Sequence, residues 1–296
     1  MADAPLLVTG GSGQLATALQ HAATACGRAV RRVGRPGFDF DCPESIRRTF
    51  EEVRPAAVVN AAAYTAVDAA ETDPDAAYRA NRDGPAELAR LCAEARVPLV
   101  HISTDYVFDG SKSEPYREDD PVNPQGVYGA SKRAGEEAVW AAHPGAVVLR
   151  TSWVYAAMGK NFVQAMLGAA QRTNRLRVVA DQQGCPTSAA DLAAAILAIL
   201  PLLREGDAGS RIFHLAGTGS ATWHAFATAV FESAARYGIS PPAIEPIATA
   251  DWPTAAKRPA NSRLDCSLAA SRFGVSLPHW RGSLDRVIDT IYSVGA

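Results

Sequence analysis

Short apolar runs alternate with longer stretches of helical periodicity through the first 150 residues. Between two such runs, Ile46, Phe50 and Val53 recur at intervals of four and three and give one helix a single apolar face. Strands that alternate with helices predict a parallel sheet with helices on both faces, in a Rossmann-like, doubly wound α/β fold. The five mainly apolar runs predicted as strands are residues 5–9, 29–33, 57–60, 97–103 and 146–150.

Helix boundaries follow from capping and breaking residues. The Ala-rich stretch 14–26 ends at Gly27, a residue typical of helix ends. Asp41 is expected to cap the next helix, because Pro43 suits its first turn and Glu44 stands three positions on. A further helix is predicted over 127–142.

Beyond Thr151 the alternation loosens. Predicted helices at 161–173, 191–203, 223–237 and 283–293 are joined by loops that contain Gly and Pro. We therefore predict a dinucleotide-binding domain over residues 1–150 and a smaller α/β substrate-binding lobe over 151–296. Segments after residue 172 are expected to return to the main sheet.

Composition and charge exclude several classes of protein. Hydrophobic residues make up 48% of the 296 residues and the formal net charge is −2, so nothing favours binding to nucleic acid or an anionic membrane. No apolar run reaches the ~18–20 residues of a membrane span, and the N-terminus lacks a secretion signal. The five cysteines are far apart and form no C-x-x-C pair. We expect a cytoplasmic protein with reduced, mostly buried thiols.

A glycine-rich turn joins the first strand to the first helix. Its spacing is Gly10-x-x-Gly13-x-x-Ala16, in the strand–turn–helix context that a dinucleotide pyrophosphate requires. No acidic residue ends the second strand, and Arg35 stands just past it. A planar guanidinium there can pair with a 2′-phosphate, which favours NADPH, with NADH as the alternative.

Tyr128 and Lys132 lie four residues apart on a predicted helix and so share one face. A tyrosine titrates near ~10, and an ammonium at ~4 Å is expected to lower that pKa by roughly three units, which suits a general acid. The preceding strand ends in Ser103-Thr104-Asp105, where ligands bind in an open α/β sheet. The order of loop, hydroxyl, tyrosine and lysine predicts a nicotinamide-dependent carbonyl reductase, with Thr104, Tyr128 and Lys132 catalytic.

Several longer segments resemble the extended short-chain dehydrogenase/reductase superfamily and, within it, the dTDP-4-dehydrorhamnose reductases, almost end to end. Besides the glycine-rich turn and the Tyr-Lys pair, they are Asn60–Asp68, Ser103–Phe108, Arg150–Tyr155, Asp181–Thr187, Thr222–His224 and Arg258–Ser262. The resemblance implies NAD(P)H-dependent reduction of the C4 ketone of dTDP-4-dehydro-L-rhamnose to dTDP-L-rhamnose, for polysaccharide biosynthesis.

The resemblance also implies a role for each matching residue. Thr104 and Tyr128 would bind the keto oxygen, and Lys132 the nicotinamide ribose. The other implied cofactor-binding residues are Gly10, Gly13, Gln14 and Leu15 at the pyrophosphate, Asp39 and Phe40 at the adenine, and Ala62, Ala63 and Thr65 at the ribose. Those implied around the sugar or nucleotide are Val67, Asp105, Tyr106, Trp153 and Gln182, with the face of Trp153 suited to the C–H surface of a sugar.

Three residues depart from the family pattern. Ala69 stands where the family often has Lys. Some members dimerise through a magnesium bridge between carboxylates, and Leu15 and Ala190 occupy the places where such carboxylates are expected. We therefore expect no bound metal, and a monomer or a weak homodimer.

Other functions find less support in the sequence. His101 and His214 lie in apolar strands and are predicted core residues, and the acidic loop 114–120 is expected to be a solvated lid. There is no Gly-x-Ser-x-Gly elbow or metal-ligand cluster. The alternatives that stay open are a nucleotide-sugar epimerase or dehydratase with the same Tyr-Lys pair, and a non-catalytic regulatory subunit on this fold.

Overall fold

The computed structural model describes residues 4–203 and 211–293. Its centre is a six-stranded sheet in the order β10-β5-β4-β3-β1-β2, in which all paired strands are parallel. The strands are β1 (Leu6–Thr9), β2 (Val30–Val33), β3 (Ala57–Asn60), β4 (Leu99–Thr104), β5 (Val147–Thr151) and β10 (Ile212–His214). The predicted α/β fold is confirmed.

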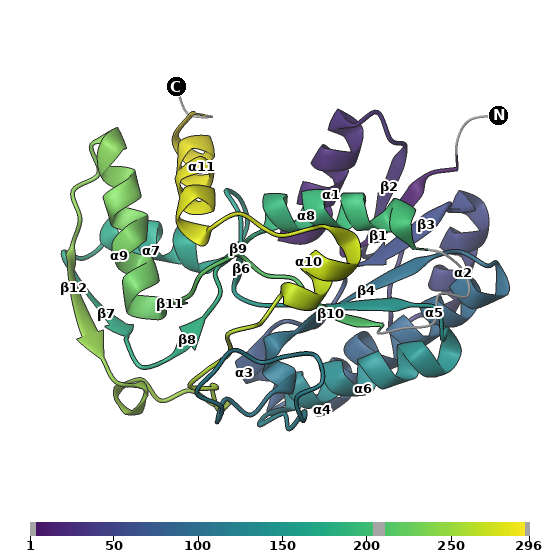
Figure 1. Ribbon diagram of the computed structural model, residues 1–296, viewed down its shortest axis with the longest axis horizontal. Helices are drawn as coiled ribbons and strands as arrows, with labels where there is room; N and C mark the ends of the chain where they lie inside the picture. Colours follow the sequence, from purple (N-terminus) through teal and green to yellow (C-terminus); the bar gives the residue numbers. More distant parts are fainter. Residues whose placement is uncertain (1–3, 204–210, 294–296) are drawn as a thin grey trace.

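Side chains alternate between the two faces of this sheet, and helices cover both (Figure 1). Leu6 and Val8 belong to one hydrophobic cluster, while Leu7 between them belongs to another. The first cluster includes residues of α1 (Gln14–Ala25), α8 (Ala189–Ile199) and α10 (Ser267–Phe273). The second includes residues of α2 (Pro43–Val53), α5 (Gly84–Glu94) and α6 (Val127–Ala142).

Segments from the second half of the chain complete this sheet. β10 pairs with β5, and α8 packs against α1. His214 in β10 and His101 in β4 are fully buried, which confirms both as core residues. The strand order reverses direction between β1 and β3, and ligands bind beyond the carboxyl ends of strands at such a point.

A second group of elements lies to the left in Figure 1 and has a hydrophobic cluster of its own. It contains the parallel pair β7 (Arg175–Val179) and β12 (Ala243–Ile247), together with α7 (Phe162–Ala170), α9 (Trp223–Ala234) and α11 (Trp280–Ser293). Short pairs join it to the rest: β6 (Val154–Tyr155) with β9 (Thr187–Ser188), and β8 (Gln183–Gly184) with β11 (Ala221–Thr222). The boundary at residue 150 between a dinucleotide-binding domain and a substrate-binding lobe stays a prediction.

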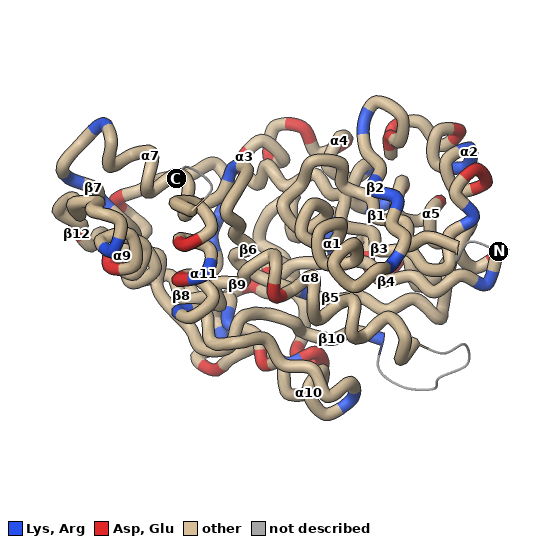
Figure 2. Tube along the Cα trace, turned by 90° about the horizontal axis from the view of Figure 1, so that it is seen from above, with Lys and Arg blue, Asp and Glu red and all other residues tan. Residues whose placement is uncertain are grey.

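Two local expectations are wrong. α2 begins at Pro43 with Cys42 as its N-cap, and the Asp41 carboxylate pairs with Arg35 and Arg79 instead of capping the helix. Only Cys92 and Cys185 of the five free cysteines are buried. Figure 2 shows Lys and Arg positions interspersed with Asp and Glu positions along the chain.

Candidate functional site

A cavity of about 870 Å³ opens at the carboxyl ends of the strands. Its lining includes all but one of the residues predicted for the site: Gly10, Gly13, Gln14, Leu15, Arg35, Asp39, Phe40, Ala62, Ala63, Thr65, Val67, Thr104, Asp105, Tyr106, Tyr128, Lys132 and Trp153. The exception is Gln182. Topology brings these residues together because most of them follow or end strands of the parallel sheet.

The glycine-rich turn is built to approach a ligand closely. Gly10 has φ +111°, and a Cβ there would lie 3.0 Å from the Ala61 carbonyl oxygen. A Cβ on Gly34 would lie 2.5 Å from the Cα of Gly11. α1 begins at Gln14 with no side-chain cap and no acidic residue in its first turn, so no side chain caps its first amides, and Gly13, Gln14 and Leu15 line the cavity. These donors fit a dinucleotide pyrophosphate.

Buried polar groups fix the neighbouring loop across three strands. The Thr9 hydroxyl donates to Asn60 Oδ1 at 2.6 Å and accepts from the backbone amide of Ala62 at 3.1 Å. The Asn60 amide contacts His101 Nδ1 at 2.9 Å. Burial, with the charge of Lys132, holds the pKa of His101 well below its usual range, so this imidazole is neutral. The network positions residues 61–63 along the cavity wall.

Arg35 lies at the far end of the cavity, where its guanidinium is shared between two carboxylates. It donates to Asp39 Oδ1 and to Asp41 Oδ2, each at 2.9 Å, and Asp41 also accepts from Arg79 at 2.8 Å. The Arg35 side chain is 65% exposed, and exposed ion pairs contribute only about 0–1 kcal/mol. Exchange of these partners for a phosphate therefore costs little.

Thr104 and Tyr128 line the cavity together at the end of β4. Thr104 Oγ1 donates to Asp105 Oδ1 at 2.9 Å, and the Thr104 hydroxyl lies close enough to Tyr128 to lower the pKa of its phenol, against the larger effect of burial. Close helix packing makes this possible: a Cβ on Gly129 would lie 2.1 Å from the Tyr106 carbonyl oxygen, so only glycine lets α6 approach the 105–107 turn so closely. The predicted meeting of Thr104, Tyr128 and Lys132 in one site is observed.

The expected effect of Lys132 on Tyr128 is not observed. Lys132 Nζ donates to the Ile102 carbonyl oxygen at 2.6 Å, and burial raises the pKa of Tyr128 above its ordinary value of 10. The prediction that Lys132 lowers this pKa is therefore wrong for this arrangement. Burial also lowers the pKa of Lys132 from 10.5 to about 8. Tyr128 consequently carries its proton at neutral pH, as the acid in a carbonyl reduction must.

Acidic and aromatic groups surround the two hydroxyls. Burial raises the pKa of Asp105 to about 6 against the hydrogen bonds from Ser262 and Thr104, which lower it. The Tyr106 ring packs edge-on against Tyr128, with centroids 5.5 Å apart.

Trp153 also lines the cavity, and its indole is covered on one face by a second tryptophan. Its indole stacks on that of Trp223, with ring centroids 3.5 Å apart and planes 6° from parallel, so this face is closed to a sugar. Its backbone has φ +46°, an uncommon conformation for a non-glycine residue. Gln182 lies behind this wall and accepts from Trp223 Nε1 at 3.1 Å. Gln182 is not among the residues that line the cavity, and its contact with the sugar or nucleotide stays a prediction.

Sequence reasoning missed three residues that shape the site. Lys160, in the loop before α7, and Trp223, the first residue of α9, line the cavity. Asn81 is fully buried in a π-helical turn (Arg79–Asp83); it accepts from the amide of Tyr64 at 2.8 Å and donates to Ser131 Oγ at 2.9 Å. It thus ties the cavity loop to α6. The only sequence indication for Trp223 was its place in a segment shared with the resembling family.

The described ranges, 4–203 and 211–293, contain neither a membrane-spanning helix nor a cluster of metal-ligating side chains. No helix there is long and apolar enough to cross a membrane. No group of three or more His, Cys, Asp or Glu side chains there is arranged to hold a metal ion.

Comparisons with known proteins agree with this geometry. The family model described as RmlD substrate binding domain matches residues 4–293. A dTDP-4-dehydrorhamnose reductase from Sinorhizobium fredii is 45% identical over 285 residues, which cover 96% of each chain. Crystal structures of this reductase from Clostridium acetobutylicum and, in complex with NADP, from Bacillus anthracis both superpose with a TM-score of 0.89. They are 35% and 33% identical to the chain and cover 97% of it and 99% of their own length. The chain belongs to the dTDP-4-dehydrorhamnose reductase family.

Proposed function

We propose that the chain reduces the C4 ketone of dTDP-4-dehydro-L-rhamnose to the alcohol of dTDP-L-rhamnose, with NADPH as the reductant. The observation that carries this proposal is that Thr104, Tyr128 and Lys132 line the same cavity as the glycine-rich turn. The substrate is supported by the reductases of that name that cover nearly the whole chain. The cofactor is supported by the NADP complex of a relative and by Arg35 at the cavity's end.

Thr104 and Tyr128 hold the ketone oxygen between their hydroxyl groups. NADPH, when bound, supplies a hydride to the C4 carbon. The electron pair of the C=O π bond moves to the oxygen, which takes the proton of the Tyr128 hydroxyl and becomes the alcohol. Tyr128 is left as a phenolate, which then regains a proton from water.

The remaining predicted residues divide between the two molecules. We assign Gly10, Gly13, Gln14 and Leu15 to the cofactor's pyrophosphate, Arg35, Asp39 and Phe40 to its adenosine end, and Ala62, Ala63, Thr65 and Lys132 to its riboses. We assign Val67, Asp105, Tyr106 and Trp153 to the nucleotide sugar; Gln182 acts through Trp223.

The compartment and the oligomeric state complete the proposal. We place the reaction in the cytoplasm, supported by five cysteines that are all free. We propose a monomer or weak homodimer, supported by Leu15 and Ala190 at positions where the family's bridging carboxylates are expected.

The test is an assay with dTDP-4-dehydro-L-rhamnose and NADPH, followed by absorbance at the nicotinamide band and by NMR of the product. We expect one NADPH to be oxidised for each sugar reduced. Turnover of the sugar without net oxidation would identify an epimerase or dehydratase. No turnover, with the cofactor still bound, would identify a non-catalytic subunit.

A further inference from the structure

Two tryptophans from distant parts of the chain form one flat stack in the cavity wall. Trp153 follows β5, and Trp223 begins α9. Their ring centroids are 3.5 Å apart and their planes differ by 6°. At that separation the rings overlap almost fully, because it is about the thickness of one aromatic ring. One face of Trp153 is therefore covered by Trp223.

Gly184 packs against the second face of Trp153 at one rim of the indole. A Cβ built on Gly184 would lie 2.3, 2.5 and 2.6 Å from Cε2, Nε1 and Cζ2 of Trp153. A point at such distances from three consecutive ring atoms lies above the plane of the indole, over its rim at Cε2. It must be on the side opposite to Trp223, since the stack leaves no room between the two indoles. Trp153 is therefore held between Trp223 on one side and the backbone of Gly184 on the other.

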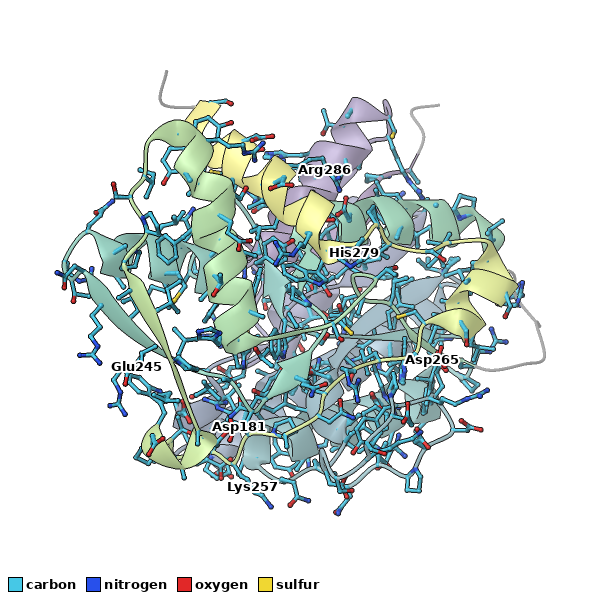
Figure 3. The ribbon with its side chains drawn as sticks, turned by 60° about the vertical axis from the view of Figure 1, so that its left-hand side comes forward. Asp181, Glu245, Lys257, Asp265, His279 and Arg286 are labelled. Atoms are coloured by element: carbon cyan, nitrogen blue, oxygen red, sulfur yellow. The ribbon has the colours of Figure 1, made fainter. Side chains whose placement is uncertain are left out.

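A chain of hydrogen bonds fixes Trp223 in this stack. Trp223 Nε1 donates to Gln182 Oε1 at 3.1 Å, and Gln182 Nε2 donates to Thr249 Oγ1 at 3.0 Å. Thr249 in turn donates to Asp181 through its hydroxyl at 2.6 Å and its amide at 2.9 Å. Figure 3 shows Asp181 beside the turn that follows β12. The antiparallel β8–β11 pair sets the register by placing Thr222 opposite Gln183.

We propose that Trp223 is a positioning residue for the nucleotide sugar: together with Gly184 it clamps the Trp153 indole, so that this ring is held in one orientation in the cavity wall. This inference rests on the proposed function for its substrate. It adds to that function a residue that affects how the sugar is placed and that is separate from Tyr128 and Lys132. Trp223 acts through Trp153, while Gln182 holds Trp223 from behind the wall.

The clamp is tested by steady-state kinetics and circular dichroism of four variants. Trp223→Leu removes one half of the stack. Gly184→Ala keeps both indoles but forces Trp153 out of its place, because the ring cannot move toward Trp223. Each is expected to raise the KM for dTDP-4-dehydro-L-rhamnose about tenfold and to leave the KM for NADPH within about twofold. Each is also expected to abolish the far-ultraviolet exciton couplet that two stacked indoles produce.

The double variant Trp153→Leu/Trp223→Leu separates positioning from a general structural role. If Trp223 acts through Trp153, its loss adds nothing once Trp153 is gone, and the double variant matches Trp153→Leu within about twofold. If the increases in KM of the two single variants multiply in the double variant, the proposal is overturned. It is also overturned if Gly184→Ala keeps the KM and the couplet of the wild type. Trp252→Leu, at an exposed tryptophan outside the described ring contacts, is the matched control and should change neither readout.

The proposal and the proposed function can fail separately. A wild-type protein that does not turn over this sugar would refute the function, while the couplet would still report whether the clamp forms. A wild-type protein that turns it over, with unchanged KM in Trp223→Leu and Gly184→Ala, would refute the clamp alone.

Discussion

A buried ion pair beneath the site gives a demanding test of the structure. Glu136 on α6 and Arg150 on β5 are 0% and 1% exposed, and they are joined by two hydrogen bonds of 2.8 Å each. The carboxylate also accepts from Arg133 at 3.0 Å, and the Arg150 guanidinium lies over the Phe108 ring. The pair holds the helix that carries Tyr128 and Lys132 against the sheet.

Glu136→Gln removes the charge and leaves Arg150 buried without a counter-ion. At a charge separation of ~4 Å and an effective dielectric of ~20 the lost attraction is about 4 kcal/mol, close to the roughly 3–5 kcal/mol known for broken buried pairs. We expect a fall of that size in the free energy of unfolding, measured by urea denaturation at neutral pH. Glu137→Gln is the matched control, because that side chain is 60% exposed and also pairs with Arg133; its cost is expected to stay below about 0.5 kcal/mol.

The pair also predicts a pH dependence. Burial raises the pKa of Glu136, but the hydrogen bonds and charge of Arg150 outweigh it and leave the pKa below its ordinary value of 4.5. An acid with a lowered folded-state pKa stabilises the protein above its unfolded pKa, and this contribution is lost as the pH falls below 4.5. The difference between wild type and Glu136→Gln should therefore shrink in acid. Equal costs for Glu136→Gln and Glu137→Gln at neutral pH would refute the reasoning.

Three further predictions concern the site itself. Tyr128→Phe is expected to lower kcat by about 10²–10⁴-fold with little change in KM, and unchanged turnover would exclude Tyr128 as the proton donor. Arg35→Ala is expected to raise the KM for NADPH about tenfold and not that for NADH, whereas Arg79→Ala should change neither; equal effects on both cofactors would contradict the 2′-phosphate assignment. Burial raises the pKa of Asp105 from 3.8 to about 6, so its ionisation destabilises the folded protein by up to roughly 3 kcal/mol as the pH rises through that range. Asp105→Asn should accordingly raise the Tm more at about pH 8 than at about pH 5, and an equal gain at both would contradict a raised pKa.

The parts of the fold that the sequence predicted are those set by local pattern. Strand β3 is wholly buried and apolar up to Asn60, and the α2 helix has one apolar face at Ile46 and Phe50. The glycine-rich turn and the Thr104–Lys132 group could be placed together without contacts, because parallel strands end at one edge of a sheet. The local sequence pattern and the topology of a parallel sheet were therefore enough to predict that these residues lie in one cavity.

The errors arose where distant segments compete for the same group. Asp41 has the right neighbours for a helix cap, but Arg35 and Arg79 bind its carboxylate instead. Lys132 has the right spacing to act on Tyr128, but the Ile102 carbonyl takes its ammonium. Arg79 and Ile102 cannot be recognised from sequence spacing, since they are about thirty or more positions away from the group they bind, whereas Arg35 is six positions from Asp41.

The wall of the cavity is formed by residues that are far apart in the sequence, unlike the catalytic centre. The centre comes from the end of β4 and the start of α6, which one local segment supplies. The wall needs Trp153, Gly184 and Trp223, which meet only through a pair of two-residue strands, β8 and β11. Such strands have no periodicity to detect, so their register is fixed by the fold as a whole. Enzymes that share the Tyr-Lys pair but reduce other sugars are therefore expected to differ first in these wall segments, where a substitution changes the shape offered to the sugar without altering the proton donor.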